Sequence, residues 1–143
     1  MFKNPEDNEI RSIMQKSVSI AIVGLSGNRD KDSNLVARYL QEKGYRIIPV
    51  NPGEAEILGL KSYPDLISIP EKIDIVNVFR RSEHLPSVVE EALKVGTGCI
   101  WAQLGVAEEG SAARAASRGI TVVMNLCIKN EHKRLLANNH EKQ

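Results

Sequence analysis

Five short runs of apolar residues stand out along the chain, and within each run the apolar positions are mostly continuous rather than alternating with polar ones. Continuous apolar runs of this length are typical of strands that are buried on both faces of a parallel sheet. Glycine, proline and asparagine residues stand between or beside the runs and favour turns there. The predicted strands are residues 18–23, 45–50, 73–79, 98–103 and 120–124.

Amphipathic segments separate most of these runs. In residues 33–43, for example, apolar side chains recur at helical spacing, and Gly44 follows as a stop signal. The crossover over residues 54–70 differs because glycine and proline interrupt it, and we expect only a short helical turn around residues 65–67. The predicted helices are residues 6–15, 33–43, 82–95, 108–118 and 129–137, and residues 138–143 are expected to be a frayed tail.

Strands that alternate with helices favour an α/β fold, because each crossover returns the chain to the next parallel strand. The 143 residues therefore predict a single Rossmann-like, doubly wound, three-layer domain over residues 1–143, with a five-stranded parallel sheet and the strand order 3-2-1-4-5. The helix within residues 1–16 is expected to pack across its body. Ligands of such sheets bind beyond the carboxyl ends of the strands, here near the switch between the first and fourth strands.

Composition narrows the class of partner. Lys and Arg exceed Asp and Glu by 19 − 18 = 1, and aromatic residues make up 4% of the chain, so neither feature suits a nucleic-acid-binding surface. No apolar run approaches the roughly 20 residues of a membrane-spanning helix. The first residues lack the apolar core of a secretory signal. We therefore expect no nucleic acid, no membrane and a cytoplasmic location.

The two cysteines, Cys99 and Cys127, lack the spacing of metal ligands, so no metal site is expected. Cys99 lies within an apolar run, as does Trp101, and both are predicted to belong to the core. Cys127 instead follows the last predicted strand, at the edge where a ligand would bind. A redox or thiol-exchange role for Cys127 is therefore a hypothesis.

The loop after the first predicted strand begins as Gly24-Leu25-Ser26-Gly27. A dinucleotide-binding loop carries glycines spaced as GxGxxG, and an acidic residue closes its second strand to hold the ribose hydroxyls. Here the glycines are out of register, and Asn51 stands at the end of the second strand. A nucleoside triphosphate loop requires Gly-Lys-Ser or Gly-Lys-Thr, which this loop lacks. Both common nucleotide loops are therefore disfavoured.

The loop offers instead a series of polar side chains that can meet phosphate oxygens. Backbone N–H groups at the start of the following helix add to such an anion site, because they point away from the helix toward the ligand. The polar residues are Ser26, Asn28, Arg29, Lys31 and Ser33. This pattern favours a ligand that bears phosphate.

Short motifs along the chain carry a family resemblance. They are, in order, Gly24-x-Ser26, Val50-Asn51-Pro52, Gly59, Tyr63-Pro64, Ile69-Pro70, Asp74-Ile75-Val76, Val78-Phe79-Arg80, Trp101-x-Gln103-x-Gly105 and Val123-Met124-x-x-Cys127-x-x-x-Glu131. With these motifs the chain resembles the small stand-alone CoA-binding proteins, whose fold is that of the CoA-binding domain of the succinyl-CoA synthetase α chain. The resemblance extends over residues 17–136.

The resemblance implies a domain that binds coenzyme A, with the phosphates at the first loop and the adenosine end across the loops after the second and third strands. Gly24 and Ser26 would shape the phosphate cradle, and Lys31 stands where the family usually has arginine. Gly27 and Arg29 stand where family members often have proline. The residues implied to bind the cofactor are Gly24, Ser26, Asn28, Lys31, Ser33, Asn51, Pro52, Phe79, Arg80, Gln103 and Gly105.

The predicted cleft offers no general acid and base pair, so the sequence favours a binding module without catalysis, whose partner is a small molecule, CoA or an acyl-CoA. Three alternatives remain. They are an NAD(P)-dependent oxidoreductase, an acyl-CoA ligase subunit completed by another chain, and a regulatory homodimer with a vestigial site that uses the apolar helix face of residues 126–136. If CoA binds, a mixed disulfide between Cys127 and the CoA thiol is a further hypothesis.

Overall fold

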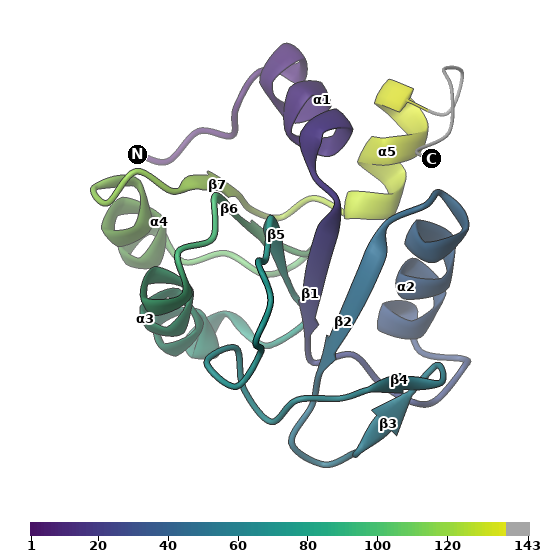
Figure 1. Ribbon diagram of the computed structural model, residues 1–143. Helices are drawn as coiled ribbons and strands as arrows, with labels where there is room; N and C mark the ends of the chain where they lie inside the picture. Colours follow the sequence, from purple (N-terminus) through teal and green to yellow (C-terminus); the bar gives the residue numbers. More distant parts are fainter. Residues whose placement is uncertain (137–143) are drawn as a thin grey trace.

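In the computed structural model, which describes residues 1–136, five strands form one parallel sheet with helices packed on both faces (Figure 1). One face is covered by α1 (Asp7–Lys16), α2 (Asp32–Glu42) and α5 (Ile128–Leu136), and the other by α3 (Leu85–Val95) and α4 (Glu109–Ala116). The strands are β1 (Ser19–Val23), β2 (Arg46–Val50), β5 (Ile75–Val78), β6 (Cys99–Ala102) and β7 (Thr121–Val123). The predicted Rossmann-like α/β class is confirmed.

Each predicted strand and each of the predicted helices forms, with ends that shift by a few residues. The helix expected over residues 82–95 begins as a short 3-10 turn, η1 (Ser82–His84), before α3. The central strands β1 and β5 are buried along their whole length, as their continuous apolar runs require. The predicted last residue of the C-terminal helix, Ala137, and the tail over residues 138–143 lie outside the described residues.

The crossover between β2 and β5 holds a hairpin that we did not predict. In this hairpin β3 (Glu56–Ile57) pairs antiparallel with β4 (Leu60–Lys61), and the two residues between them both adopt positive φ. Where a helical turn was expected, the Asp65 carboxylate accepts a hydrogen bond from Ser68 N–H at 2.8 Å and closes a tight turn. The described residues of this crossover therefore contain no helix.

The strand order corrects the predicted 3-2-1-4-5. The sheet runs β2-β1-β5-β6-β7, which is 2-1-3-4-5 when the parallel strands are counted along the chain, so β2 lies at an edge and not inside the sheet. Pro49 gives the physical reason, because it has no N–H to donate to a third strand on the outer side of β2. On that side the Pro49 carbonyl oxygen accepts from Tyr63 N–H at 3.0 Å, within an isolated bridge.

The corrected strand order changes the place at the sheet edge where a ligand is expected to bind. The chain leaves β1 toward α2 on one face of the sheet and leaves β5 toward α3 on the other face. The loops that follow these two neighbouring strands therefore diverge at the carboxyl ends of the strands (Figure 1). Open α/β sheets bind their ligands at such a switch point. The switch lies between β1 and β5, not between the first and fourth strands as expected, and the loops over residues 24–31 and 79–81 begin there.

Trp101 anchors the core on the face of α1, α2 and α5. Its side chain is fully buried, and its indole N–H donates to the Leu126 carbonyl oxygen at 2.8 Å, which ties β6 to the segment before α5. Cys99 is buried on the same face, as predicted, and burial raises the pKa of its thiol to about 12. Ile128 and Leu135 of α5 also lie in this core, so the apolar helix face predicted as a dimer interface is buried within the chain itself.

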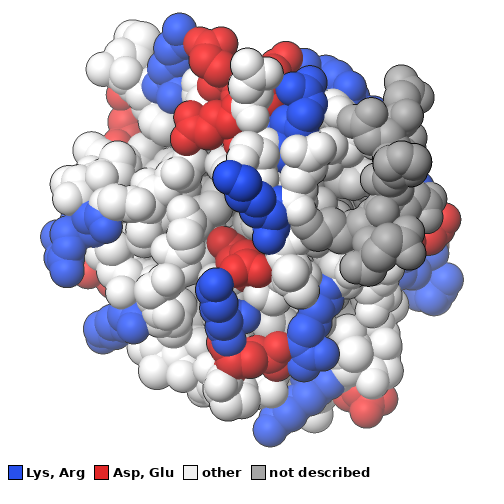
Figure 2. Space-filling model, turned by 45° about the horizontal axis from the view of Figure 1, so that its top comes forward, with Lys and Arg blue, Asp and Glu red and all other residues white. Residues whose placement is uncertain are grey.

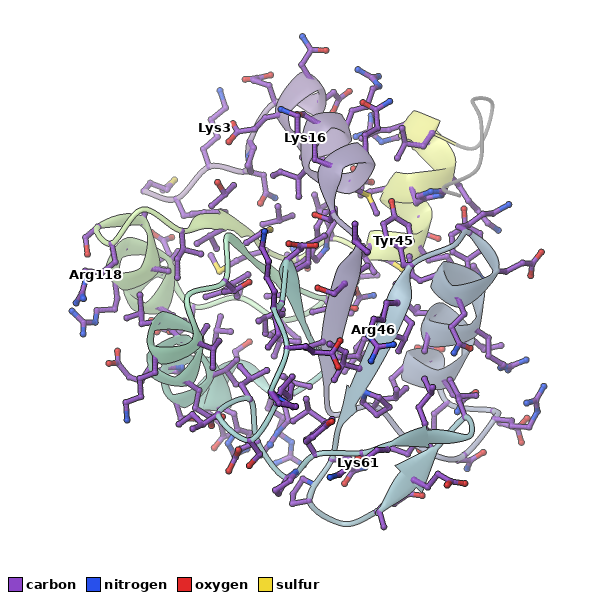
Figure 3. All side chains as sticks on the ribbon, in the orientation of Figure 1. Lys3, Lys16, Tyr45, Arg46, Lys61 and Arg118 are labelled. Carbon is purple, nitrogen blue, oxygen red and sulfur yellow. The ribbon has the colours of Figure 1, made fainter. Side chains whose placement is uncertain are left out.

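The N-terminal helix packs across this core as expected. Tyr45 at the start of β2 reaches toward α1 (Figure 3), where its hydroxyl donates to the Met14 carbonyl oxygen at 2.6 Å. Arg134 of α5 donates two hydrogen bonds of 2.8 Å to the carboxylate of Asp7. Contacts with both β2 and α5 thus hold α1 in place.

The segment before α1 lies along the end of β7. The Asn4 side chain pairs with the backbone of Met124 in both directions: its Nδ2 donates to the carbonyl oxygen at 2.9 Å and its Oδ1 accepts from the N–H at 2.8 Å. Phe2 packs against the core on the side of α3 and α4. The start of the chain therefore contacts the sheet edge opposite to β2.

The face that carries α1 shows Lys and Arg side chains interspersed with Asp and Glu (Figure 2). The described residues of this face form no continuous basic stripe of the kind that a nucleic-acid-binding surface presents. In the part of the chain that the structure describes, no helix is both long and apolar enough to cross a bilayer.

Candidate functional site

A cleft of about 590 Å³ opens at the carboxyl edge of the sheet, between the start of α2, the ends of β5 and β6, and the start of α5. Its volume lies in the range of small-molecule sites, about 300–1,000 Å³. Of the predicted ligand-binding residues, Phe79, Arg80, Gln103 and Gly105 line it. The full lining is Asp32, Leu35, Val36, Phe79, Arg80, Arg81, Gln103, Leu104, Gly105, Val106, Cys127, Lys129 and Asn130.

Gly24 joins the loop after β1 to the loop after β5. Its φ is +88°, and a Cβ atom there would lie 2.4 Å from the backbone oxygen of Phe79, so no other residue fits without a shift of the backbone. The Gly24 N–H also donates to the Val50 carbonyl oxygen at 2.9 Å, at the end of β2. One residue without a side chain therefore holds three strand ends together beside the cleft.

The predicted polar residues of the first loop hold its backbone. Ser33 Oγ accepts from Ser26 N–H at 3.0 Å, Ser26 Oγ accepts from Asn28 N–H at 3.0 Å, and Asn28 Oδ1 accepts from Asp30 N–H at 2.9 Å. Neither serine hydroxyl donates a hydrogen bond within residues 1–136, so both protons remain for an acceptor such as phosphate. Lys31 precedes α2 and is exposed.

Asn34 is a loop-holding residue that the sequence analysis missed. Its side chain is 1% exposed; Nδ2 donates to the Ser26 carbonyl oxygen at 2.8 Å, and Oδ1 accepts from Arg38 Nε at 2.9 Å. A polar residue on the buried side of a helix was the available signal, because such a residue needs hydrogen-bond partners. Asn34 thus fixes the first loop against the first turn of α2.

Glu54, from the loop after β2, is a second residue that was missed. Its carboxylate accepts from Gly27 N–H at 3.0 Å, and a Cβ atom at position 27 would lie 2.3 Å from Glu54 Oε1. A backbone N–H in this loop is therefore engaged with a negatively charged group of the chain itself. Binding of a phosphate by this loop stays a prediction, because the negatively charged group at the Gly27 N–H in this structure is the Glu54 carboxylate.

Asn51 and Pro52, both predicted to bind the ligand, lie beside the cleft and not in its lining. Asn51 Nδ2 donates to the Leu25 carbonyl oxygen at 2.9 Å, and its Oδ1 accepts from Gly53 N–H at 2.8 Å, so the side chain joins the first and second loops. Pro52 lines a smaller cavity of about 50 Å³ at the other face of the sheet. Arg80 lines both this cavity and the main cleft.

Gln103 is held at the floor of the cleft by the core beneath it. Its Oε1 accepts from Asn77 Nδ2 at 3.2 Å and from Ile128 N–H at 3.1 Å, while Asn77 Nδ2 also donates to the Trp101 carbonyl oxygen at 3.1 Å. These contacts fix which end of the Gln103 amide faces inward. Asn77 Oδ1, which is fully buried, has no hydrogen-bond partner within residues 1–136.

Positive charge predominates around the cleft. Arg80, Arg81 and Lys129 line it, whereas Asp32 alone among the lining residues is acidic. None of the three cations forms an ion pair within residues 1–136. Lys129 was not predicted, although it follows the last strand at the same edge. Lys129 Nζ lies 5.8 Å from the centre of the Tyr39 ring, within reach of a cation–π contact. Cations that form no ion pair around a cleft favour an anionic ligand.

Groups suited to catalysis do not gather here. Within residues 1–136, no group of three His, Cys, Asp or Glu side chains is placed to hold a metal ion. His132 is 3% exposed, and its Nδ1 lies 2.7 Å from the Tyr39 hydroxyl oxygen, away from the lining of the cleft.

Comparison with known proteins identifies the family. A family model described as a CoA binding domain matches residues 18–133. An uncharacterized protein of Bacillus subtilis, YneT, is 48% identical over 131 residues, which is 92% of this chain and 97% of the relative. The solved structure of a hypothetical protein from Pyrococcus horikoshii OT3 is 36% identical, with a TM-score of 0.90, and the match covers 95% of this chain and 98% of that one.

A third relative is a much longer enzyme, and only a part of it matches this chain. An ADP-forming acetate–CoA ligase of Archaeoglobus fulgidus is 32% identical over 95 residues, which is 64% of this chain but 14% of the ligase. The similarity therefore concerns one portion of that enzyme.

Proposed function

Since this chain belongs to the family of CoA binding domains, we propose that it binds coenzyme A, or an acyl-CoA, at the carboxyl edge of its sheet. The observation that carries the proposal is a set of cations that form no ion pair within residues 1–136 and line a cleft of about 590 Å³, namely Arg80, Arg81 and Lys129. CoA bears several phosphate charges, and hydrogen bonds from cationic side chains to phosphate are among the strongest in proteins.

We propose that the phosphates lie at the first loop and that the pantetheine arm follows the cleft. Ser26 and Ser33 have hydroxyl protons to donate, and the exposed Lys31 adds a charge at the start of α2. The adenosine end would lie toward Asn51 and Pro52. Arg80 supports this arrangement, because it lines both the main cleft and the smaller cavity beside Pro52.

The bound phosphate would meet competition from Glu54. In this structure the Glu54 carboxylate accepts a hydrogen bond from Gly27 N–H at 3.0 Å. A phosphate oxygen that takes this N–H must displace the carboxylate, which is exposed and belongs to a separate loop. The first loop would therefore exchange an internal anion for the phosphate of the ligand.

We propose further that the chain acts as a binding module without catalysis of its own, in the cytoplasm. The cleft is lined by three cations, by the side-chain amides of Gln103 and Asn130, and by a single carboxylate, Asp32, so its lining offers no pair of carboxyl groups. The alternative is a ligase subunit completed by another chain. It rests on the similarity to acetate–CoA ligases, although the segment matched in the Archaeoglobus fulgidus enzyme is only 14% of that enzyme. Co-purification with an ATP-binding chain would favour that alternative.

Isothermal titration calorimetry tests the proposal with five ligands side by side: CoA, acetyl-CoA, dephospho-CoA, NAD⁺ and NADP⁺. We expect CoA and acetyl-CoA to bind and NAD⁺ not to compete with them. If Lys31 contacts the ribose 3′-phosphate, CoA binds more tightly than dephospho-CoA, and Lys31→Ala removes that preference. Tighter binding of NAD⁺, or no binding of any CoA species, would mean that the family fold is present without its ligand.

A matched pair of arginine variants tests the cleft itself. Loss of a charged hydrogen bond costs about 1.5–3 kcal/mol, so Arg80→Ala should weaken CoA binding by about tenfold or more. Arg118→Ala removes an arginine of the same charge at the far end of α4 (Figure 3) and should leave CoA binding unchanged. Equal effects of both variants would indicate general attraction by net charge and not a specific site.

A further inference from the structure

The two cysteines of the chain differ sharply in their surroundings. Cys99 lies within β6, is 2% exposed, and burial raises the pKa of its thiol to about 12, so it is chemically inert. Cys127 is half-buried and lines the cleft of about 590 Å³ at the start of α5. A small molecule that fills the cleft would therefore lie against the thiol of Cys127 and could not reach that of Cys99.

A second feature at the same end of the cleft points to a ligand. Gln103 is 6% exposed, and its Oε1 accepts from both Asn77 Nδ2 and Ile128 N–H, at 3.2 and 3.1 Å. Because the oxygen is held inward, the amide nitrogen faces the cleft, and it donates no hydrogen bond within residues 1–136. The N–H groups of this amide are therefore available in the cleft, and a ligand carbonyl oxygen would accept a hydrogen bond from them.

The positions of these two groups are linked through the backbone. Ile128, whose N–H binds Gln103 Oε1, is the residue directly after Cys127. The pantetheine arm of CoA carries amide carbonyl groups and ends in a thiol. An arm whose carbonyl accepts from Gln103 would thus carry its sulfur through the part of the cleft that Cys127 lines.

We propose that Cys127 captures CoA covalently, by thiol–disulfide exchange with CoA disulfide or another disulfide of CoA. This inference rests on the proposed binding of CoA to the cleft. The partner is an anionic disulfide, which the surrounding cations Arg80, Arg81 and Lys129 attract. The product is a mixed disulfide between the protein and CoA, held in place by the nucleotide contacts as well as by the new bond.

The exchange balances without an added oxidant. The thiolate of Cys127 attacks the CoA sulfur of the disulfide, a new S–S bond forms between Cys127 and that CoA, and the original S–S bond breaks. The second thiol leaves as a thiolate and takes a proton from water, while the proton of Cys127 goes to water. Cys127 is oxidised to the level of a disulfide, and the departing thiol is the reduced product.

Intact-protein mass spectrometry tests the proposal. We expect wild-type protein treated with CoA disulfide to gain one CoA, which a reductant removes, and Cys127→Ser to gain none. Cys99, present in both proteins, serves as the internal control. Glutathione disulfide offers the same reaction without a nucleotide, so the wild type should react with CoA disulfide at least tenfold faster. Acetyl-CoA, which can occupy the cleft but has no free thiol, should slow the reaction with CoA disulfide.

Two results would overturn the proposal. Equal rates with the two disulfides would show that Cys127 is merely an accessible thiol. An adduct on Cys99 would show that Cys99, and not Cys127, reacts with the disulfide. Calorimetry separates this failure from that of the proposed function. If Cys127→Ser and wild type both bind CoA while wild type forms no adduct, the covalent step alone is refuted; if neither binds CoA, both proposals fall together.

Discussion

A single methyl group at Gly24 should separate the two loops that meet at the switch point of the sheet. The Cβ atom of Gly24→Ala would lie 2.4 Å from the Phe79 oxygen and 3.1 Å from its carbonyl carbon. Neither side can yield easily. Phe79 N–H donates to the Val23 carbonyl oxygen at 2.8 Å, and Gly24 N–H donates to the Val50 carbonyl oxygen at 2.9 Å. The substitution must therefore strain the ladder between β1 and β5 or the end of β2.

The loss of folding free energy in Gly24→Ala has two contributions, and a second glycine of the chain allows them to be measured separately. A positive φ costs a residue with a Cβ about 1–2 kcal/mol, and forcing an extra carbon into a packed region costs about 1–3 kcal/mol. Gly119 has nearly the same φ, +85° against +88°, but a Cβ there meets nothing within 4 Å. Gly119→Ala should thus cost about 1–2 kcal/mol and Gly24→Ala roughly 2–5 kcal/mol.

Urea unfolding followed by the fluorescence of Trp101 measures the loss of stability in both variants, because Trp101 is the sole tryptophan and is fully buried. With an m-value of about 2 kcal/mol per molar urea, Gly119→Ala lowers the midpoint by about 0.5–1 M and Gly24→Ala by about 1–2.5 M. Equal midpoints for the two variants would refute the reasoning, since they would leave the close approach of Gly24 to Phe79 without any energetic effect.

Three further changes test other contacts. Asn4→Ala leaves the backbone N–H and carbonyl of Met124 unpaired, and we expect a loss of about 1–3 kcal/mol in urea unfolding. Burial opposes the ionisation of Asp74, but backbone N–H donors at the start of β1 outweigh it and lower its pKa. Its stabilisation is complete above the unfolded pKa of about 3.9 and is lost as pH falls through the lower folded pKa, so the stability deficit of Asp74→Asn should be constant near pH 7 and shrink below about pH 4. A deficit unchanged at low pH would contradict this. Glu54→Gln should tighten CoA binding several-fold in calorimetry, because it removes a competing carboxylate; weaker binding would assign Glu54 a positive role.

The elements of the fold were predictable because hydrophobic continuity marks buried parallel strands, and each run became one. The order of the strands was not deduced correctly, although Pro49 carried the necessary information. A proline in the middle of the second run argues against a central strand, and placing β2 at the edge leaves β5 as the natural neighbour of β1. The hairpin of β3 and β4 had no comparable signal, since its strands are two residues long.

The candidate site was predictable in outline, since the carboxyl ends of parallel strands converge on one edge. Phe79, Arg80, Gln103 and Gly105 line the cleft as expected. Their roles in binding CoA stay predictions until they are tested. The contact of Glu54 with the first loop bridges 27 residues and depends on the path of the crossover, which periodicity does not specify.

The two outer strands share a feature that bears on how copies of this chain meet. A strand at the margin of a sheet exposes backbone groups that can pair with another molecule and seed aggregates. Here Pro49 and the bridge between its neighbour Val50 and Tyr63 interrupt one margin, and the two-way pairing of Asn4 with Met124 fills the end of the other. Extension of the sheet from one molecule into the next is therefore opposed at both margins.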